Sequence, residues 1–309
     1  MIQIFKLFIF VGLLSISVSA QKLNGTVINN ETQTPVELAS VYFKHSKYTV
    51  FADVGGKFSI EIGSKNTKDL LIISCIGYED LEVDLKRYLE KKEYSDTFRL
   101  VPKVQMLNEI VISNEKIDYS WAKKITSKRN PNAGFSFQFG TENVTFVQNS
   151  YFKKGKIKKV ILSLDKATED RKQPKWKIDY ITAYNIKFYK YDARNQKPGE
   201  ELYSKNIVVE PENKSYDFVI DVDSLNIPFP KEGVCVGVEY VNTRYKNPKS
   251  SFATIGPVMN FYEEEKLKPI IAWSRYRGED WEFKSSVSNF KNRRYQNVMV
   301  VDLVVNAEK

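Results

Sequence analysis

A series of short strand-like runs, each ended by turn-forming residues, limits the fold of this chain more than any other feature. In the first third of the chain the runs cover residues 23–28, 39–43, 57–62, 69–76 and 81–85. Asn29-Asn30 follows the first run, Gly55-Gly56 precedes the third and Gly77 ends the fourth. Runs spaced by roughly 8–15 residues suit an antiparallel β-sandwich and leave no room for the helical crossovers of a parallel sheet.

The rest of the chain continues this pattern over a longer stretch. Its strand-like runs cover residues 135–139, 144–148, 157–164, 178–191, 207–210, 216–222, 234–241, 270–274 and 298–304. The composition agrees, because the chain has 19 Phe and 18 Tyr, which favour strands. We expect an all-β protein whose second part is a larger jelly-roll or galactose-binding-like sandwich. The nearly continuous apolar run 298–304 predicts one central strand, buried on both faces.

Charge divides the chain near residue 113. Residues 21–112 carry 12 basic and 13 acidic residues, whereas residues 113–309 carry 34 and 25, so the basic surface lies in the larger part. Between them, Trp121 to Ile125 is a short helical candidate that Asn130-Pro131 would end. We expect a sandwich over residues 21–112, a linker with a short helix over 113–130, and a basic sandwich over 131–309. The helix would pack Trp121 and Ile125 inward.

Residues 1–20 have the features of a secretory signal peptide. Lys6 precedes an apolar run, and Ser17-Val18-Ser19-Ala20 offers a small-residue cleavage site. The alternative is a retained membrane anchor, but residues 7–20 fall short of the roughly 20 residues that span hydrocarbon. No later stretch has 18 uninterrupted apolar residues. We therefore expect an exported chain without a transmembrane span after cleavage, periplasmic, outer-membrane-associated or secreted.

The scarcity of histidine argues against several kinds of catalytic site. The only histidine is His45, whereas the metal of a zinc peptidase requires two histidines. A catalytic triad would likewise depend on this one residue. Cys75 and Cys235 lie in apolar runs, which favours two buried thiols, although an exported protein can form a disulfide. We expect no catalytic metal, no cofactor and no enzymatic activity.

Several motifs in the first third resemble the carboxypeptidase regulatory-like domain. They are Gly25-Thr26-Val27, Thr34-Pro35-Val36, Ala39-Ser40-Val41-Tyr42, Gly56-Lys57-Phe58-Ser59 and Ile76-Gly77-Tyr78-Glu79. The resemblance covers residues 22–112 and implies a transthyretin-like β-sandwich that folds and docks but does not hydrolyse. Such domains open exported envelope proteins, including TonB-dependent receptors. A receptor barrel of about 22 strands would consume most of this chain, so the barrel is absent.

Aromatic and cationic residues gather near the end of the chain, where we place the candidate ligand-binding site. It consists of Trp273, Arg275, Tyr276 and Trp281. An exposed aromatic ring offers a flat surface to a sugar, and an arginine can bind its hydroxyl groups. The alternative places Trp273 in the core and Trp281 at its rim, with the arginine in solvent.

Two charged features have plainer interpretations. The lysine-rich residues 153–159 are typical of a solvated strand that resists edge-to-edge aggregation, and contact with an acidic glycan or lipopolysaccharide is the alternative. No nucleic-acid motif accompanies them, so we expect no nucleic-acid partner. The acidic residues 165–170 and 263–265 lack the spacing of an EF-hand, which leaves a structural calcium as a lesser alternative.

Together these features favour a non-catalytic exported protein of the cell envelope. Its larger sandwich would bind a glycan or a protein partner, and the first domain would dock it. A structural accessory subunit of an outer-membrane complex, without a small ligand, is the second hypothesis. An orphan hydrolase is a remote third. The ligand and the oligomeric state are left open.

Overall fold

The structure is a computed structural model, and strands account for nearly all of its regular elements. It describes residues 21–45, 49–63, 66–75, 77–88, 93–103, 117–126, 132–134, 140–166, 182–241, 255–263, 270–276, 279–283, 285–287 and 294–309. Within these ranges the elements are strands and two short 3-10 helices, which confirms the all-β prediction. The same ranges contain no helix long and apolar enough to cross a membrane. The expected signal peptide, residues 1–20, lies outside them.

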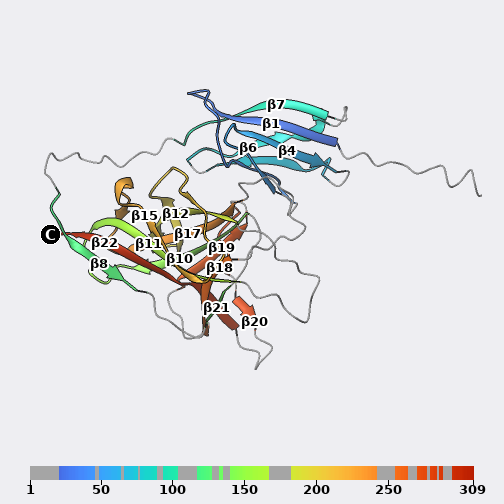
Figure 1. The fold of residues 1–309 in the computed structure, drawn as a ribbon. Helices are drawn as coiled ribbons and strands as arrows, with labels where there is room; N and C mark the ends of the chain where they lie inside the picture. The colour runs from blue at the N-terminus through green and yellow to red at the C-terminus, as the bar shows by residue number, and fades with distance from the viewer. Residues whose placement is uncertain are drawn as a thin grey trace, which may run out of the picture.

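Seven strands form the first sandwich, which lies at the top of Figure 1. They are β1 (Gln21–Asn29), β2 (Ser40–Phe43), β3 (Thr49–Phe51), β4 (Lys57–Ile62), β5 (Leu70–Ser74), β6 (Leu81–Asp84) and β7 (Glu93–Leu100), with the 3-10 helix η1 (Leu85–Tyr88) before the last. One sheet has the order β4-β1-β7 and the other β3-β2-β5-β6. The core lies between them, since alternate residues of β4 (Phe58, Ile60 and Ile62) are buried.

One feature of this sandwich differs from the sequence prediction. β7 pairs with β1 in parallel, so the sandwich is not wholly antiparallel. The chain leaves β6 in one sheet, passes through η1 and enters the other sheet beside β1. The sequence analysis missed β7 because its charged residues weaken the apolar pattern, and it missed β3 because that strand has only 3 residues.

The remaining strands form the second, larger sandwich. They are β8 (Tyr119–Ile125), β9 (Asn132–Gly134), β10 (Thr141–Gln148), β11 (Gly155–Lys166), β12 (Ala183–Asp192), β13 (Lys197–Glu201), β14 (Val208–Val209), β15 (Tyr216–Asp221), β16 (Pro228–Phe229), β17 (Gly233–Val241), β18 (Ile255–Glu263), β19 (Ala272–Tyr276), β20 (Ser285–Val287), β21 (Arg294–Met299) and β22 (Val301–Glu308), with η2 (Asp223–Leu225) before β16. A six-stranded sheet has the order β13-β12-β17-β10-β19, with β14 beside β12. A nine-stranded sheet follows the order β20-β21-β18-β11-β22-β8, with β15 and β16 beside β11 and β9 beside β18.

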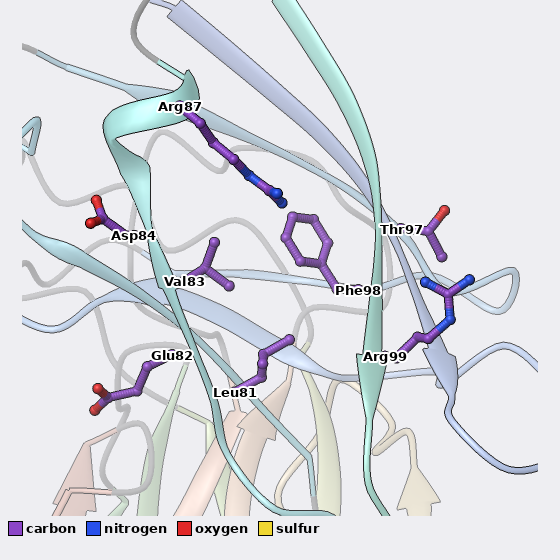
Figure 2. Close-up of a pocket in the computed structure, with 8 residues that line it drawn as sticks. All are labelled: Leu81, Glu82, Val83, Asp84, Arg87, Thr97, Phe98 and Arg99. Carbon is purple, nitrogen blue, oxygen red and sulfur yellow. The ribbon is translucent and has the colours of Figure 1, made fainter.

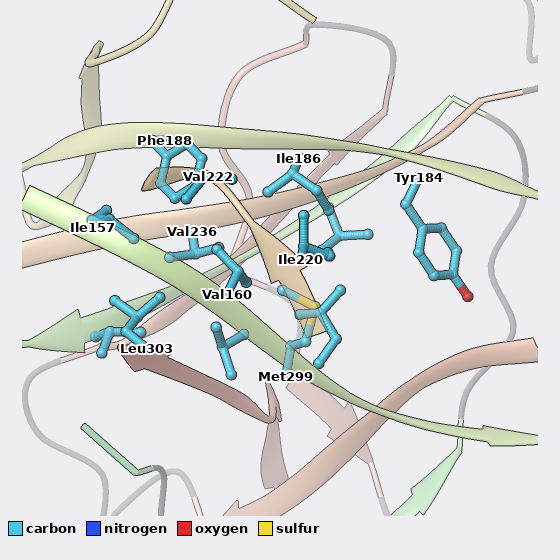
Figure 3. Close-up of a cluster of buried hydrophobic side chains, with 14 of the residues drawn as sticks. Ile157, Val160, Tyr184, Ile186, Phe188, Ile220, Val222, Val236, Met299 and Leu303 are labelled. Carbon is cyan, nitrogen blue, oxygen red and sulfur yellow. The ribbon is translucent and has the colours of Figure 1, made fainter. Parts of the chain in front are cut away.

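The main core fills the space between these two sheets. Figure 3 shows Ile186 and Phe188 of β12 approaching Val160 of β11 and Leu303 of β22. All four side chains are buried in one apolar cluster. The prediction of a second, larger β-sandwich is therefore confirmed.

The predicted linker helix is wrong. Residues 119–125 form β8, which pairs with β22 in the nine-stranded sheet. Five residues cannot form a stable isolated helix, whereas a strand gains its hydrogen bonds from a neighbour already in place. Trp121 does not pack inward, because 83% of it is exposed, while Ile125 does pack against the core. The second sandwich thus begins before residue 131, inside the predicted linker.

The predicted single strand at 298–304 is also wrong. β21 ends at Met299 and β22 begins at Val301, and the amide of Val300 between them donates to the carbonyl of Val258 at 2.9 Å. A continuous apolar run does not reveal such a break, because both strands are buried. The predicted strand 135–139 and the first part of 178–191 lie outside the described residues.

The two sandwiches touch through a small apolar cluster. Leu38 and Phe51 of the first pack with Ala183 and Val241 of the second. This contact lies at the end of β12 and β17. The six-stranded sheet therefore has one face toward the core and, at this end, the other toward the first sandwich.

Candidate functional site

Polar side chains cross the outer face of the six-stranded sheet in one row. Residues of β12 alternate, so Tyr184, Ile186 and Phe188 enter the core and Asn185, Lys187 and Tyr189 lie on the outer face. Strand register then places Asn185 opposite Glu239, Glu239 opposite Glu142, and Glu142 opposite Arg275. Four strands thus contribute to one row.

Five of these side chains form a buried ion cluster, namely Glu142, Lys187, Tyr189, Glu239 and Arg275. Nζ of Lys187 lies 3.0 Å from Oε2 of Glu239 and 3.6 Å from Oε2 of Glu142. Arg275 donates from Nε to Glu142 at 2.8 Å and from Nη2 to the Tyr189 hydroxyl at 2.9 Å. That hydroxyl donates to Oε1 of Glu142 at 2.6 Å. Glu142 thus accepts from two partners and faces two cations.

Gly237 makes room for the ion cluster. It lies on β17 between Lys187 and Val144 of the neighbouring strands. A Cβ atom at this position would lie 2.7 Å from Oε1 of Glu142 and 3.3 Å from the ring of Tyr189. The missing side chain therefore lets the carboxylate and the phenol meet above the sheet.

The charges of the ion cluster balance. Burial raises the pKa of Glu142, but Arg275 and Lys187 outweigh it, so the pKa is below its ordinary value. Burial lowers the pKa of Lys187, yet Glu142 and Glu239 raise it above the ordinary value. Burial and the charge of Glu142 hold the pKa of Tyr189 well above its ordinary value. Two carboxylates therefore face two cations, and the phenol stays neutral. Such an arrangement fixes strands to one another.

Partly exposed apolar side chains, three of them aromatic, cover the part of this face beyond the ion cluster. We call Phe146, Tyr191, Ile270 and Trp281 the aromatic surface, since all four pack on the buried residues of this face. The rings of Phe146 and Tyr191 stack with centroids 4.3 Å apart and planes 25° apart. The indole of Trp281 meets the ring of Tyr189 edge-on at 5.5 Å.

The structure brings together three of the four residues predicted from the sequence. Arg275 lies over the ring of Trp281 at 4.0 Å, and Trp273 lies on the same sheet face. Trp273 is only 5% exposed, however, so it cannot offer a flat surface to a ligand. Arg275 is held by Glu142 and is not solvated. Tyr276 ends β19 opposite Thr141.

Sequence reasoning missed Phe146 and Tyr191, which are partly exposed, and Glu142 and Lys187, which are buried. The signal for two of them was present. Residues 186–191 alternate apolar and polar, which puts Lys187 and Tyr191 on one face of a strand. Glu142 gave no such signal, because its partner Arg275 is 133 residues away.

Both cysteines are buried thiols that are not joined in a disulfide, in agreement with the thiol interpretation. Burial raises the pKa of Cys235 to about 12. At pH 8 only about one thiol in ten thousand would be ionised, and the thiolate is the form that reacts with alkylating agents. We expect Cys235 to remain unmodified by iodoacetamide at pH 8 in the folded protein and to react after denaturation. Mass spectrometry of the peptide would show this, and rapid native alkylation would contradict it.

The charged segments form ordinary ion pairs where they are described. Lys156 and Lys158 both reach Asp223, at 2.7 and 3.6 Å. Asp165 accepts from Ser215, and residues 167–170 and 264–265 lie outside the described part. Among the described residues, no group of three or more His, Cys, Asp or Glu side chains could hold a metal ion.

A separate hollow opens between the edge strands of the first sandwich. Its volume is about 460 Å³, and it lies between β6 with η1 on one side and β7 on the other. Figure 2 shows Val83 and Phe98 facing each other there, with Arg87 reaching toward the ring of Phe98. Its rim carries side chains of both signs of charge, because the acidic Glu82 and Asp84 and the basic Arg99 also line it. The hollow thus has an apolar floor and no single sign of charge.

Among the comparisons with known proteins, the family match covers the same part of the chain as the motifs. No curated protein matches the sequence. Among solved structures, a DUF3823 family protein from Bacteroides uniformis is 10% identical, with 92% of this chain and 98% of that one covered and a TM-score of 0.19. A chain of the T13 IBDV viral particle is 9% identical, with 87% and 56% covered and a TM-score of 0.24. Residues 23–112 match the family model of the CarboxypepD_reg-like domain, which confirms the resemblance seen in the motifs of the first sandwich.

Proposed function

We propose that this chain is an exported, non-catalytic protein of the cell envelope that binds a glycan on the aromatic surface. The first domain would dock it to an envelope partner. The observation that carries the proposal is the stacked pair Phe146 and Tyr191, partly exposed on the same sheet face as Trp281. Flat, rigid rings suit the apolar C–H faces of a sugar, and neighbouring polar groups can bind its hydroxyls.

The ion cluster supports this proposal by fixing the rings from below. Trp281 rests on Arg275, which two hydrogen bonds hold to Glu142 and Tyr189. Tyr191 lies on β12 two residues after Tyr189, and the hydroxyl of Tyr189 donates to the carboxylate of Glu142. A binding surface whose rings are held before the ligand arrives loses less conformational entropy on binding.

Loss of an exposed ring tests the proposal. We expect Tyr191→Ala and Trp281→Ala each to weaken binding of the glycan found on a glycan array by roughly tenfold or more, since each removes apolar contact area. Isothermal titration would measure the change. Tyr216→Ala is the matched control, because Tyr216 is a half-buried ring of another pair on β15.

The outcome separates this proposal from its alternatives. If no glycan binds the native protein, or if Tyr216→Ala weakens binding as much, the glycan proposal is wrong. Capture of an outer-membrane protein without any glycan would then favour the structural accessory subunit. The hydrolase has the least support, because Glu142 and Glu239 are each paired with a cation.

A further inference from the structure

A cluster of protruding apolar side chains lies away from the aromatic surface. Trp121 of β8 is 83% exposed, and Phe152, in the loop between β10 and β11, is 67% exposed. Tyr151 beside it is also exposed. A single exposed ring is ordinary, but several at one end of a domain mark an interaction surface.

These side chains belong to one end of the larger sandwich. Nζ of Lys123, two residues after Trp121, lies 4.4 Å from the ring centroid of Tyr151. Glu308 pairs with Tyr119 of β8, and its amide donates to the carbonyl of Lys154, so the loop and this end of β8 lie side by side. We call these three aromatic residues and the nearby lysines the basic aromatic tip; its members are Trp121, Tyr151, Phe152, Lys123, Lys153, Lys154 and Lys231.

The loop that carries Phe152 is held in place from below. Asn149 is fully buried and donates from Nδ2 to the carbonyls of Lys153 and Pro230, at 2.7 and 2.9 Å. Its Oδ1 accepts from the amide of Tyr151 at 3.0 Å. Phe152 has a φ of 53°, a left-handed conformation that costs energy for a residue with a side chain. The backbone conformation that holds this ring in solvent therefore costs conformational energy.

Lysines surround the protruding rings. Lys153 and Lys154 follow Phe152 directly, and both are exposed. Lys231 is exposed near the same loop, since the carbonyl of Glu232 accepts from the amide of Asn149. The acidic side chains at this end are Glu232, Glu308, whose amide donates to the carbonyl of Lys154, and Asp118, which pairs with Lys309 at 2.6 Å. The tip thus joins apolar rings to an excess of positive charge.

We propose that the basic aromatic tip binds the surface of a membrane that contains anionic phospholipids. Aromatic side chains settle at the level of lipid headgroups, and lysines are attracted to the negative surface. A membrane surface accepts protruding side chains of any arrangement. Trp121 and Phe152 are 83% and 67% exposed, so both rings can enter the headgroup layer without a change in the fold.

Vesicle binding by residues 21–309, which include every described strand, tests this proposal. We expect the chain to sediment with vesicles of phosphatidylcholine and phosphatidylglycerol at 3:1, and to sediment less as the salt concentration rises. Phe152→Ala, Trp121→Ala and the double variant Lys153→Gln with Lys154→Gln should each lower the partition coefficient roughly tenfold. Brominated lipids should quench the tryptophan fluorescence of the native chain. The part of the quenching that comes from Trp121 should be absent in Trp121→Phe.

Two matched variants control for general effects. Val219→Ala removes another exposed apolar side chain, and Lys86→Gln removes an exposed lysine of the first domain. We expect both to bind vesicles as the native chain does. The proposal would be overturned if the chain sedimented equally with pure phosphatidylcholine vesicles, or if the controls lost as much binding as the tip variants. Binding to soluble dextran sulfate without binding to vesicles would also overturn it.

Discussion

Replacement of Glu142 by Gln is expected to lower the free energy of unfolding by about 3–5 kcal/mol, the usual cost of removing one partner from a buried ion pair. Lys187 and Arg275 would then share the charge of Glu239, and the amide NH2 of Gln would replace one of the two oxygens that accept from Tyr189 and Arg275. Urea unfolding followed by circular dichroism would measure the change. Lys187 is only 8% exposed, so water cannot replace the lost carboxylate there.

The control for this prediction lies at the edge of the same sheet. Glu200 accepts from Lys190 at 2.6 Å, but both side chains are about half exposed. Glu200→Gln should therefore cost less than about 1 kcal/mol. A double variant Glu142→Gln with Arg275→Gln should recover part of the loss, because it removes the cation left without its partner. If Glu142→Gln costs no more than Glu200→Gln, the ion cluster does not stabilise the sheet.

Acid should weaken the same cluster. Burial opposes the ionised form of Glu142, but Arg275 and Lys187 favour it more strongly, so its pKa falls on folding. A carboxyl with a lowered pKa stabilises the fold above its ordinary pKa, and this contribution is lost as the pH falls through the folded value. The native protein should therefore lose more stability in acid than Glu142→Gln, as thermal melts at pH 7 and pH 3 would show. Equal losses would contradict the prediction.

The sequence allowed prediction of what depends on neighbours along the chain. The alternation of β4 is visible in the order of its residues, and its burial follows that order. The motifs of the first domain likewise lie within short segments, so the resemblance was found from them and the family model matches the same residues. Local patterns of this kind can be recognised in the sequence before the fold is known.

The candidate site depends instead on which strands become neighbours. Glu142 meets Arg275 because β19 pairs with β10, and it meets Lys187 across β17. No local pattern determines that order of strands. The same reasoning explains β8, since only its pairing with β22 makes residues 119–125 a strand. Trp273 ends an apolar run and Trp281 stands among acidic residues, and the fold agrees with the alternative that placed Trp273 in the core and Trp281 at its rim.

Replacement of Gly25 by Val is expected to unfold the first domain. A Cβ atom at Gly25 would lie 2.3 Å from two ring atoms of Phe58 and 2.8 Å from the ring of Phe98. Both rings are buried and pack on each other with centroids 5.6 Å apart, so neither can move aside without disturbing the core. Overpacking of this severity costs about 3 kcal/mol or more, a large share of the stability of a domain of this size. Gly63→Val is the matched control, because its nearest neighbour would be the flexible Asn66 amide at 3.4 Å.

This variant also tests whether the two domains fold independently, as we expect. The apolar contact between them is small, consisting of Leu38 and Phe51 against Ala183 and Val241. Contacts this limited are weaker than the core of either sandwich. Hydrogen exchange with mass spectrometry should therefore show full exchange in β1 and β4 of Gly25→Val, while β11, β12 and β17 keep the protection of the native chain. Loss of protection in both sandwiches would mean that they unfold as one unit, because the second domain would then depend on the first to cover the end of β12 and β17.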